Sequence, residues 1–299
     1  MDRIEAMSVL LTAVETGSLS GAGRKLGMPL PTVSRKVSEL ESHLKTRLLH
    51  RSTRRLTLTD SGRAYVEACK RILGDVEEAE RAAAGEYSAP KGDLVVTAPI
   101  VYGRLHVLPV VTEFLNAYPE VDVRLLLGDR MVNLFEDPVD LAVRVGELPD
   151  SSLIATRVGS MRQVACASPG YFAARGKPAH PGELAAHDCV TFEGLMSPGA
   201  WKFSSGKLEV SVAIHSRLVV NTADAAIAAA IAGAGITRVL SYQIAAAVHA
   251  GALEIVLQEF EPPAWPVSLV YPSQGRLPLK LRAFLDFAVP RLRSGYPSE

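Results

Sequence analysis

Apolar residues recur at helical spacing through the first sixty positions of the chain. A first helix is predicted by apolar residues three and four positions apart, with Gly17 as its C-terminal stop; they are Ile4, Met7, Leu10, Leu11 and Val14. Ser20 is the expected N-cap of a short second helix, which ends at Gly27. A third helix opens with Pro29 and Pro31, which are tolerated because first-turn amides have no helical partner in any case.

The third helix is amphipathic. Its apolar residues fall four, three and four positions apart and share one face: Val33, Val37, Leu40 and Leu44. Two short helices joined by a glycine turn, the second amphipathic and basic, predict a helix-turn-helix. Residues 48–52 and 55–58 then predict two short strands around Thr53-Arg54, a wing, and Thr59 is a natural N-cap for the next helix.

A long helix is predicted over residues 61–86. Spacings of four and three alternate along it and form a heptad seam, made of Tyr65, Cys69, Ile72, Val76, Ala79 and Ala83. The other faces are charged, so the seam has to pack against something, and a symmetry-related copy of the helix is the economical partner. Packing on its own domain is the alternative. Residues 88–93 have the composition of a linker.

Short apolar runs alternate with helical stretches from position 94 onward, which predicts α/β architecture. Strands are expected near 94–98, 121–128, 140–145, 163–168, 217–221, 236–240 and 267–271, and helices near 102–117, 223–233, 241–249 and 278–292. The length suits two lobes, with crossings expected at residues 157–161 and at Pro262-Pro263. We therefore expect a DNA-binding domain over 1–60, a linker helix over 61–87 and an effector domain over 88–299. Its lobe I would cover about 93–161 and 267–299 and its lobe II about 162–266.

Charge distribution changes this picture. The chain has a formal net charge of zero, but residues 24–63 hold ten Lys and Arg against three Asp and Glu, a net of +7 that the remaining residues balance with −7. Three cysteines with no CxxC pair fit a reducing compartment, and no stretch predicts a signal peptide or a membrane span. We expect a cytoplasmic protein with no metal and no cofactor.

Residues 12–62 resemble the helix-turn-helix domain of the LysR-type transcriptional regulators. The matching residues are Gly17-Ser18-Leu19, Ala22, Leu26-Gly27, Thr32-Val33-Ser34, Leu40-Glu41, Leu44, Arg47-Leu48-Leu49, Arg51 and Leu58-Thr59-Asp60-Ser61-Gly62. Residues 125–153 and 167–184 are similar to effector domains of that family, which resemble two-lobed periplasmic binding proteins. One departure is Pro29-Leu30, where many members carry a polar pair, so base preference is expected to differ.

A recognition helix presents its N-terminal residues to base edges in the major groove. We expect base contacts from Leu30, Pro31, Thr32 and Arg35. Phosphate contacts are expected from Ser34, Lys36, Arg51, Ser52, Thr53, Arg54 and Arg55, although a solvated turn is the alternative for Arg54-Arg55. Specific affinity generally needs two half-sites, so the target is expected to be an interrupted palindrome bound by a homodimer or homotetramer. Contact with RNA polymerase is left open.

Ligands of open α/β sheets collect where strands end and helices begin. We therefore expect an effector at Thr97, Ala98, Pro99, Tyr102, Arg144, Gly146, Asn221 and Thr222. The resemblance implies that these positions line a cleft between lobes and that the effector is a small organic acid or aromatic molecule. Three residues have alternatives: Thr222 as an N-cap, Arg144 as a salt bridge between lobes and Tyr102 as a core ring.

Two other protein classes remain. An enzyme is disfavoured because the sequence carries no GxSxG, GxxxxGK[ST] or HExxH motif. An architectural DNA-binding protein with a non-responsive sensor domain would bind many sequences almost equally, whereas a regulator discriminates among them.

Overall fold

The computed structural model describes residues 1–51, 56–83, 89–129, 134, 137–148, 153–193, 199–206, 208–273 and 277–295. The chain divides into two compact units, Met1–Gly92 and Asp93–Glu299, which are described separately. Within the described residues, no helix is both long enough and apolar enough to cross a bilayer.

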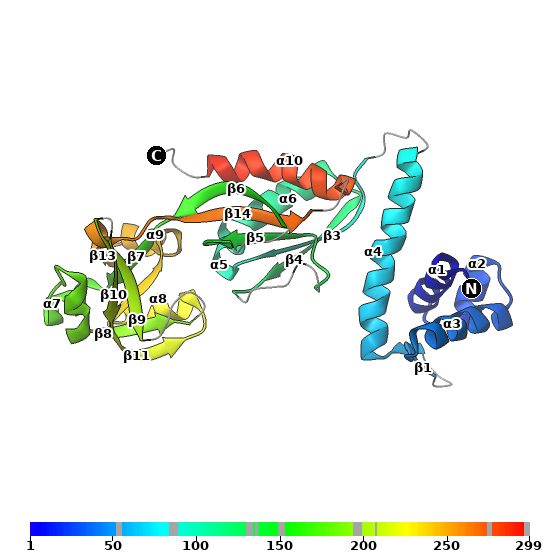
Figure 1. The fold of residues 1–299 in the computed structure, drawn as a ribbon, viewed down its shortest axis with the longest axis horizontal. Helices are drawn as coiled ribbons and strands as arrows, with labels where there is room; N and C mark the ends of the chain where they lie inside the picture. The colour runs from blue at the N-terminus through cyan, green and yellow to red at the C-terminus, as the bar shows by residue number, and fades with distance from the viewer. Residues whose placement is uncertain are drawn as a thin grey trace. The chain divides into compact units, whose positions relative to one another are not determined.

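The N-terminal unit holds four helices and a two-stranded sheet within its described residues (Figure 1). They are α1 (Arg3–Glu15), α2 (Leu19–Leu26), α3 (Leu30–Leu44), β1 (Leu49–Arg51), β2 (Leu56–Leu58) and α4 (Asp60–Ala83). Ser18, not Ser20, caps α2, because Ser18 keeps an extended backbone and its hydroxyl accepts the amide of Gly21 at 3.0 Å. Gly27 ends α2 in the left-handed region, at φ 65°, which favours glycine.

The core of this unit is made by one apolar face from each helix. Ala6, Val9, Leu10 and Ala13 of α1 pack with Val33, Val37 and Leu40 of α3, and all seven side chains are buried. Val66 of α4 closes the same cluster. The buried residues of α3 are those that the apolar spacing of the third predicted helix placed on one face, so the other faces of α3 point outward.

Lobe I of the C-terminal unit is built on a five-stranded sheet in the order β4-β3-β5-β14-β6. Most of its strands come from the start of the unit, and β14 comes from near its end. Its strands are β3 (Gly92–Ala98), β4 (Val121–Leu127), β5 (Leu141–Val145), β6 (Leu153–Met161) and β14 (Trp265–Pro272). β3 and β5 run parallel, whereas β14 is antiparallel to both β5 and β6. A continuous helical stretch follows β3: α5 (Ile100–Tyr102), a π-helical turn (Gly103–Val107) and α6 (Leu108–Ala117).

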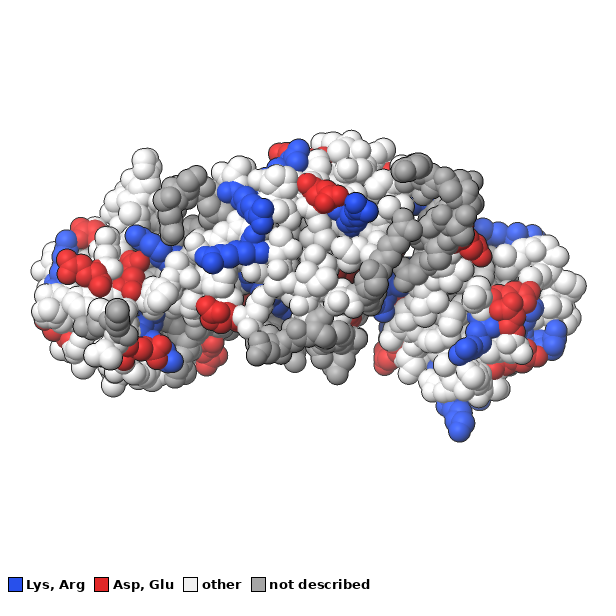
Figure 2. Space-filling model, turned by 45° about the horizontal axis from the view of Figure 1, so that its top comes forward, with Lys and Arg blue, Asp and Glu red and all other residues white. Residues whose placement is uncertain are grey.

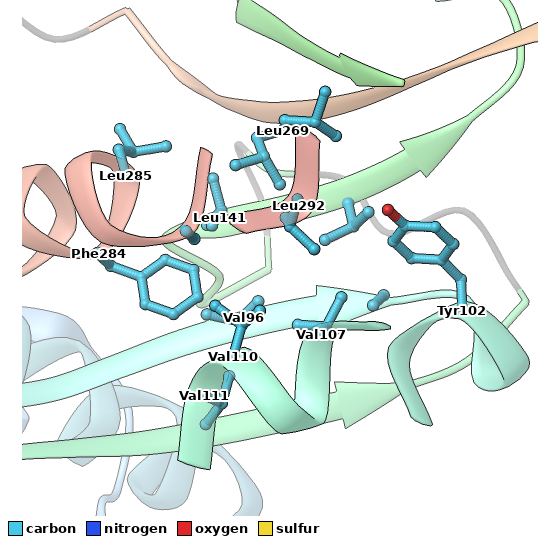
Figure 3. Packing of buried hydrophobic residues seen from close by; sticks show 14 of the residues in the cluster. Val96, Tyr102, Val107, Val110, Val111, Leu141, Leu269, Phe284, Leu285 and Leu292 are labelled. Carbon is cyan, nitrogen blue, oxygen red and sulfur yellow. The ribbon is translucent and has the colours of Figure 1, made fainter. Parts of the chain in front are cut away.

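The core of lobe I lies between its sheet and the pair α6 and α10 (Leu279–Ser294), as Figure 3 shows at close range. Val96, Leu141 and Leu269 point from the sheet toward Phe284 and Leu285 of α10. Alternate residues of β14 serve opposite faces, because side chains of a strand point up and down in turn.

Lobe II is built on a second five-stranded sheet in the order β11-β8-β12-β7-β13. Its elements are β7 (Gln163–Ala167), α7 (Pro169–Arg175), a 3₁₀ turn (Pro181–Ala186), β8 (Asp188–Phe192), β11 (His215–Val220), α8 (Ala223–Ile231), β12 (Ile236–Leu240), α9 (Ser241–His249), β13 (Glu254–Val256) and a second 3₁₀ turn (Gln258–Phe260). The hairpin β9 (Ala200–Ser205) and β10 (Leu208–Ala213) forms a separate two-stranded sheet. The whole chain is a mixed α/β protein behind a helix-turn-helix.

Two chain segments connect the lobes. Arg162 alone separates β6 of lobe I from β7 of lobe II, and residues 257–264 lead back from β13 to β14. β6 and β14 are neighbours in one sheet, so the two segments leave lobe I side by side (Figure 1). An ion pair joins the segments, with Arg162 Nε 3.3 Å from Glu261 Oε2.

Candidate nucleic-acid interface and ligand cavity

The start of α3 presents an exposed surface. Leu30 is 49% exposed and Pro31 is exposed, while Thr32 and Ser34 are half-buried. Arg35 projects outward with 66% of its side chain exposed and lies 3.2 Å from Glu39, one turn along the helix. A surface ion pair of this kind contributes little to stability, so Arg35 can leave it at low cost to meet another acceptor.

Several other basic side chains of this unit are held by acids. Lys36 pairs with Glu5 of α1 and only 16% of its side chain is exposed, and Lys25 lies 2.8 Å from Glu15. Figure 2 shows the same pattern on the face in view, where Lys and Arg of this unit lie among Asp and Glu. Lys36 was predicted to contact phosphate. Its ion pair fastens α3 to α1, and the contact with phosphate stays a prediction.

The wing is anchored to α3 through Glu41. Its Oε1 accepts the amides of Leu48 at 2.8 Å and Leu49 at 3.1 Å, just where β1 begins. Thr59 caps α4 as predicted, because its hydroxyl accepts the amide of Gly62 at 2.9 Å. Gly62 itself lies so close to the wing that a Cβ there would be 2.0 Å from the carbonyl oxygen of Leu48. These contacts fix the strands that carry the wing.

Five predicted phosphate contacts belong to this wing. The backbone of Arg51 pairs with Leu56 in the β1–β2 ladder. Ser52, Thr53, Arg54 and Arg55 lie outside the described residues, as does the side chain of Arg51.

The seam predicted on α4 divides into two parts. Tyr65 packs half-buried against the core of its own unit, and Cys69 is completely buried there, which raises the pKa of its thiol to about 11. Further along, Ile72 is 42% exposed and Val76 is half-buried. The side chains of Ala79 and Ala83 lie outside the described residues. Tyr65 therefore packs on its own unit, whereas the Ile72 side chain is exposed. The contact between copies of this helix stays a prediction.

A cavity of about 390 Å³ opens between lobes I and II. Its lining residues come from both lobes: Pro99, Gly128, Asp129, Arg144, Val145, Gly146, Glu147, Leu148, Phe192, Tyr242, Gln243 and Trp265. This volume lies in the range of small-molecule sites. Gly146 has φ 114°, which favours glycine, and its position faces the Trp265 ring, 3.5 Å from where a Cβ would stand.

The polar groups of the cavity have perturbed acidities. Burial lowers the pKa of Arg144. Burial raises the pKa of Asp129, while the Ile100 amide, 3.1 Å from its Oδ1, partly offsets that rise. Tyr242 is held by Gln243, whose Oε1 in turn accepts the amide of Leu240 at 2.8 Å. The cavity thus offers a cation, an anion and a fixed hydroxyl between aromatic walls.

Comparisons with known proteins match both units. Residues 4–63 match the family model described as bacterial regulatory helix-turn-helix protein, lysR family, and residues 88–293 match the LysR substrate binding domain. The chain belongs to the LysR family of transcriptional regulators.

Relatives of this LysR-type regulator align over nearly the whole chain. It is 36% identical over 288 residues to an HTH-type transcriptional regulator of Xanthomonas campestris, covering 95% of this chain and 84% of that protein. It is 35% identical over 291 residues to an HTH-type transcriptional repressor of Pseudomonas aeruginosa, covering 97% and 92% respectively. The solved structure of CrgA, a LysR-type transcriptional regulator from Neisseria meningitidis, is 32% identical, with a TM-score of 0.61 and coverage of 96% of this chain and 98% of that one.

In this LysR-type regulator, three of the eight predicted effector residues line the cavity: Pro99, Arg144 and Gly146. The other five lie outside its lining. Thr97 and Ala98 are buried in β3, where the Thr97 hydroxyl donates to the Leu126 carbonyl at 3.1 Å. Thr222 caps α8 by accepting the Ala225 amide at 3.3 Å, and Asn221 is exposed just before it.

Tyr102 lies one layer behind the cavity. It is completely buried, and its ring meets that of Tyr242 edge-on at a centroid distance of 5.6 Å. The sequence analysis missed Tyr242 and Trp265 themselves, along with Asp129, Phe192 and Gln243. One signal was available: Asp129 and Tyr242 each stand within two residues of the end of an expected strand, where ligands collect.

Proposed function

We propose that this LysR-type regulator reads an interrupted palindromic DNA site with two copies of α3 and that a small molecule in the cavity between the lobes changes its DNA binding. The observation that carries the proposal is the division of α3 into two faces. Val33 and Val37 are buried in the unit's core, and the opposite side presents exposed Leu30, Pro31 and Arg35. A helix anchored along one side and bare at its N-terminal end suits insertion into the major groove.

Base readout is assigned to Leu30, Pro31, Thr32 and Arg35. An arginine pairs bidentately with guanine, which discriminates by about 1–3 kcal/mol, and the apolar residues suit a thymine methyl group. Ser34 and the wing residues 51–55 are assigned to phosphates, which set affinity and register rather than sequence. Lys36 is assigned to phosphate too, in exchange for its ion pair with Glu5.

The second half-site requires a second copy of the chain. We assign Ile72 and Val76 of α4 to the contact between copies, because Ile72 is an exposed apolar residue next to the charged residues Lys70 and Arg71. Cys69 is left out of this contact because it is buried in its own unit. Dimer and tetramer both satisfy the geometry, and a contact with RNA polymerase is a further partner to test.

The proposed effector is a small organic acid or aromatic molecule. Arg144 supplies the cation for an acid, and Trp265, Phe192 and Tyr242 supply apolar faces. The proposal includes no catalytic step. Burial raises the pKa of the Cys166 and Cys189 thiols to about 12, which disfavours the nucleophilic thiolate. We place the protein in the cytoplasm, where chromosomal DNA is accessible and such thiols stay reduced.

A competition shift assay on the protein's own promoter tests the proposal. Specific DNA should bind about a thousandfold or more tighter than random DNA, and a footprint should show two half-sites. Nearly equal binding of all sequences would instead indicate an architectural protein, and a monomer on one asymmetric half-site would contradict the palindrome.

Two variants separate the assigned roles. Arg35→Ala should lose discrimination at one base position, whereas Arg54→Ala should weaken all sequences alike and flatten the dependence on salt. Equal losses from both variants, whatever the sequence, would refute the division between base and phosphate contacts.

A further inference from the structure

The lining of the cavity between the lobes contains two acidic residues, Asp129 and Glu147. Asp129 stands directly after β4 of lobe I, half-buried in the cavity lining. Its carboxylate is repelled by Asp224 of lobe II, which lies in the first turn of α8 and contributes to the raised pKa of Asp129. Burial raises the pKa of the Tyr242 hydroxyl, and the carboxylates of Asp129 and Asp224 add to that rise. Asp129 and the Tyr242 ring line the same cavity from opposite lobes.

An anionic group placed at Asp129 would be repelled by its carboxylate. A cation there would be attracted to it. A metal ion is a poor candidate, because the described residues contain no group of three or more His, Cys, Asp or Glu side chains able to hold one. An organic ammonium group needs only a carboxylate and aromatic faces, and both are present at Asp129 and Tyr242.

The rest of the cavity suits the remainder of such a ligand. Arg144 lies half-buried in the same lining and offers a guanidinium to a carboxylate. Trp265 and Phe192 come from lobe I and lobe II respectively and provide apolar walls. A volume of about 390 Å³ accommodates a small molecule. The cavity thus pairs opposite charges with an apolar surface.

We propose that the effector is an amino-acid-like zwitterion: its ammonium group binds at Asp129, its carboxylate at Arg144 and its apolar body against Trp265 and Phe192. This assignment rests on the proposed function, in which the effector occupies this cavity. It adds a positively charged group to the expected acid or aromatic molecule, and it gives a role to the half-buried carboxyl group of Asp129.

The test uses the full-length protein and two matched sets of probes. One set is L-phenylalanine, 3-phenylpropanoate, which lacks the amine, and 2-phenylethylamine, which lacks the carboxylate. The other is L-leucine with 4-methylpentanoate and 3-methylbutylamine. Affinity is measured by calorimetry and by thermal stabilisation. In at least one set, the affinity for the amino acid should exceed the affinity for each of its truncated forms by about tenfold or more.

Three variants locate the two charges. Asp129→Asn keeps an oxygen for the Ile100 amide but removes the charge, so it should weaken the amino acid and the amine about tenfold or more and spare the acid. Arg144→Gln should weaken the amino acid and the acid and spare the amine. Glu120→Gln, an exposed acid outside the cavity lining, is the matched control and should change none of them.

The failing results are distinct. The zwitterion assignment is overturned if the acids bind as tightly as the amino acids or if none of the six probes binds. It is also overturned if Asp129→Asn leaves the affinities for the amino acid and the amine unchanged. Acids that bind in the cavity and alter promoter binding would leave the proposed function standing. Loss of the proposed function itself would appear as unspecific DNA binding in the absence of any probe.

Discussion

Removal of the Glu41 carboxylate should loosen the wing from α3. Glu41 Oε1 accepts the amides of Leu48 and Leu49 at 2.8 and 3.1 Å, and these residues are only 1% and 5% exposed. Hydrogen bonds to charged acceptors contribute about 1.5–3 kcal/mol each, and the half-buried position of Glu41 favours the lower end. Glu41→Ala should therefore cost about 2–3 kcal/mol of local stability, since both amides lose their acceptor in a buried place.

Hydrogen exchange measured on the full-length protein reads this loss directly. A cost of about 2–3 kcal/mol corresponds to an increase of about 30- to 150-fold in the exchange rate of amides in β1. Glu41→Gln keeps a carbonyl acceptor and should cost about 1 kcal/mol. Glu39→Ala is the control, because its ion pair with Arg35 lies on the surface and contributes less than about 1 kcal/mol. The reasoning fails if Glu41→Ala leaves exchange unchanged or if Glu39→Ala costs as much.

Three further predictions concern α4 and the cavity. Ile72→Asp should weaken self-association by about tenfold or more, measured by light scattering. The control Arg71→Asp, one position away, should leave self-association unchanged. Equal effects of the two variants would show that Ile72 does not lie in the contact between copies. Gly62→Ala should lower stability by about 2 kcal/mol or more in urea unfolding because its Cβ would overlap the backbone before β1, while Gly74→Ala, with open space around it, should raise stability by up to about 1 kcal/mol. Burial raises the pKa of Asp129, so the protonation of this group stabilises the folded chain as the pH falls through its folded pKa. Asp129→Asn should therefore reduce the rise in melting temperature on acidification. An unchanged dependence of the melting temperature on pH would contradict burial as the cause of the raised pKa.

The helix-turn-helix could be predicted from sequence because its determinants are local. Apolar spacing selected the buried face of α3, and Gly27 marked the turn before it. The N-cap of α2 was misassigned to Ser20 because capping depends on which serine keeps an extended backbone, and the sequence does not distinguish it from Ser18. The alternation of strands and helices likewise predicted α/β architecture correctly.

Other strands escaped the prediction for a physical reason. β6 reads LIATRVGSM and mixes polar with apolar residues, because it lies at the edge of its sheet and many of its side chains are exposed. β8 reads DCVTF and is buried along most of its length, but the polar residues Asp188 and Thr191 interrupt its apolar run. Lateral pairing decides such strands, and pairing partners far apart in sequence leave no local pattern.

The cavity was the least predictable part. Residues at the ends of strands, where a helix begins, were predicted to bind the effector. Such residues line a ligand site only where the two lobes leave a cavity between them. Trp265 and Phe192 are separated by more than seventy positions and meet only through the pairing of both sheets. Tyr102 and Tyr242 have the same chemistry, and only their depth in the fold separates a supporting ring from a lining one.

The two connections between the lobes have a mechanical consequence. They leave neighbouring strands, and the ion pair between Arg162 and Glu261 ties them together, so they form one paired connection. Any change in the angle between the lobes therefore has to bend both segments at once. Lining residues such as Asp129 lie outside this connection, so a substitution there leaves its ion pair in place.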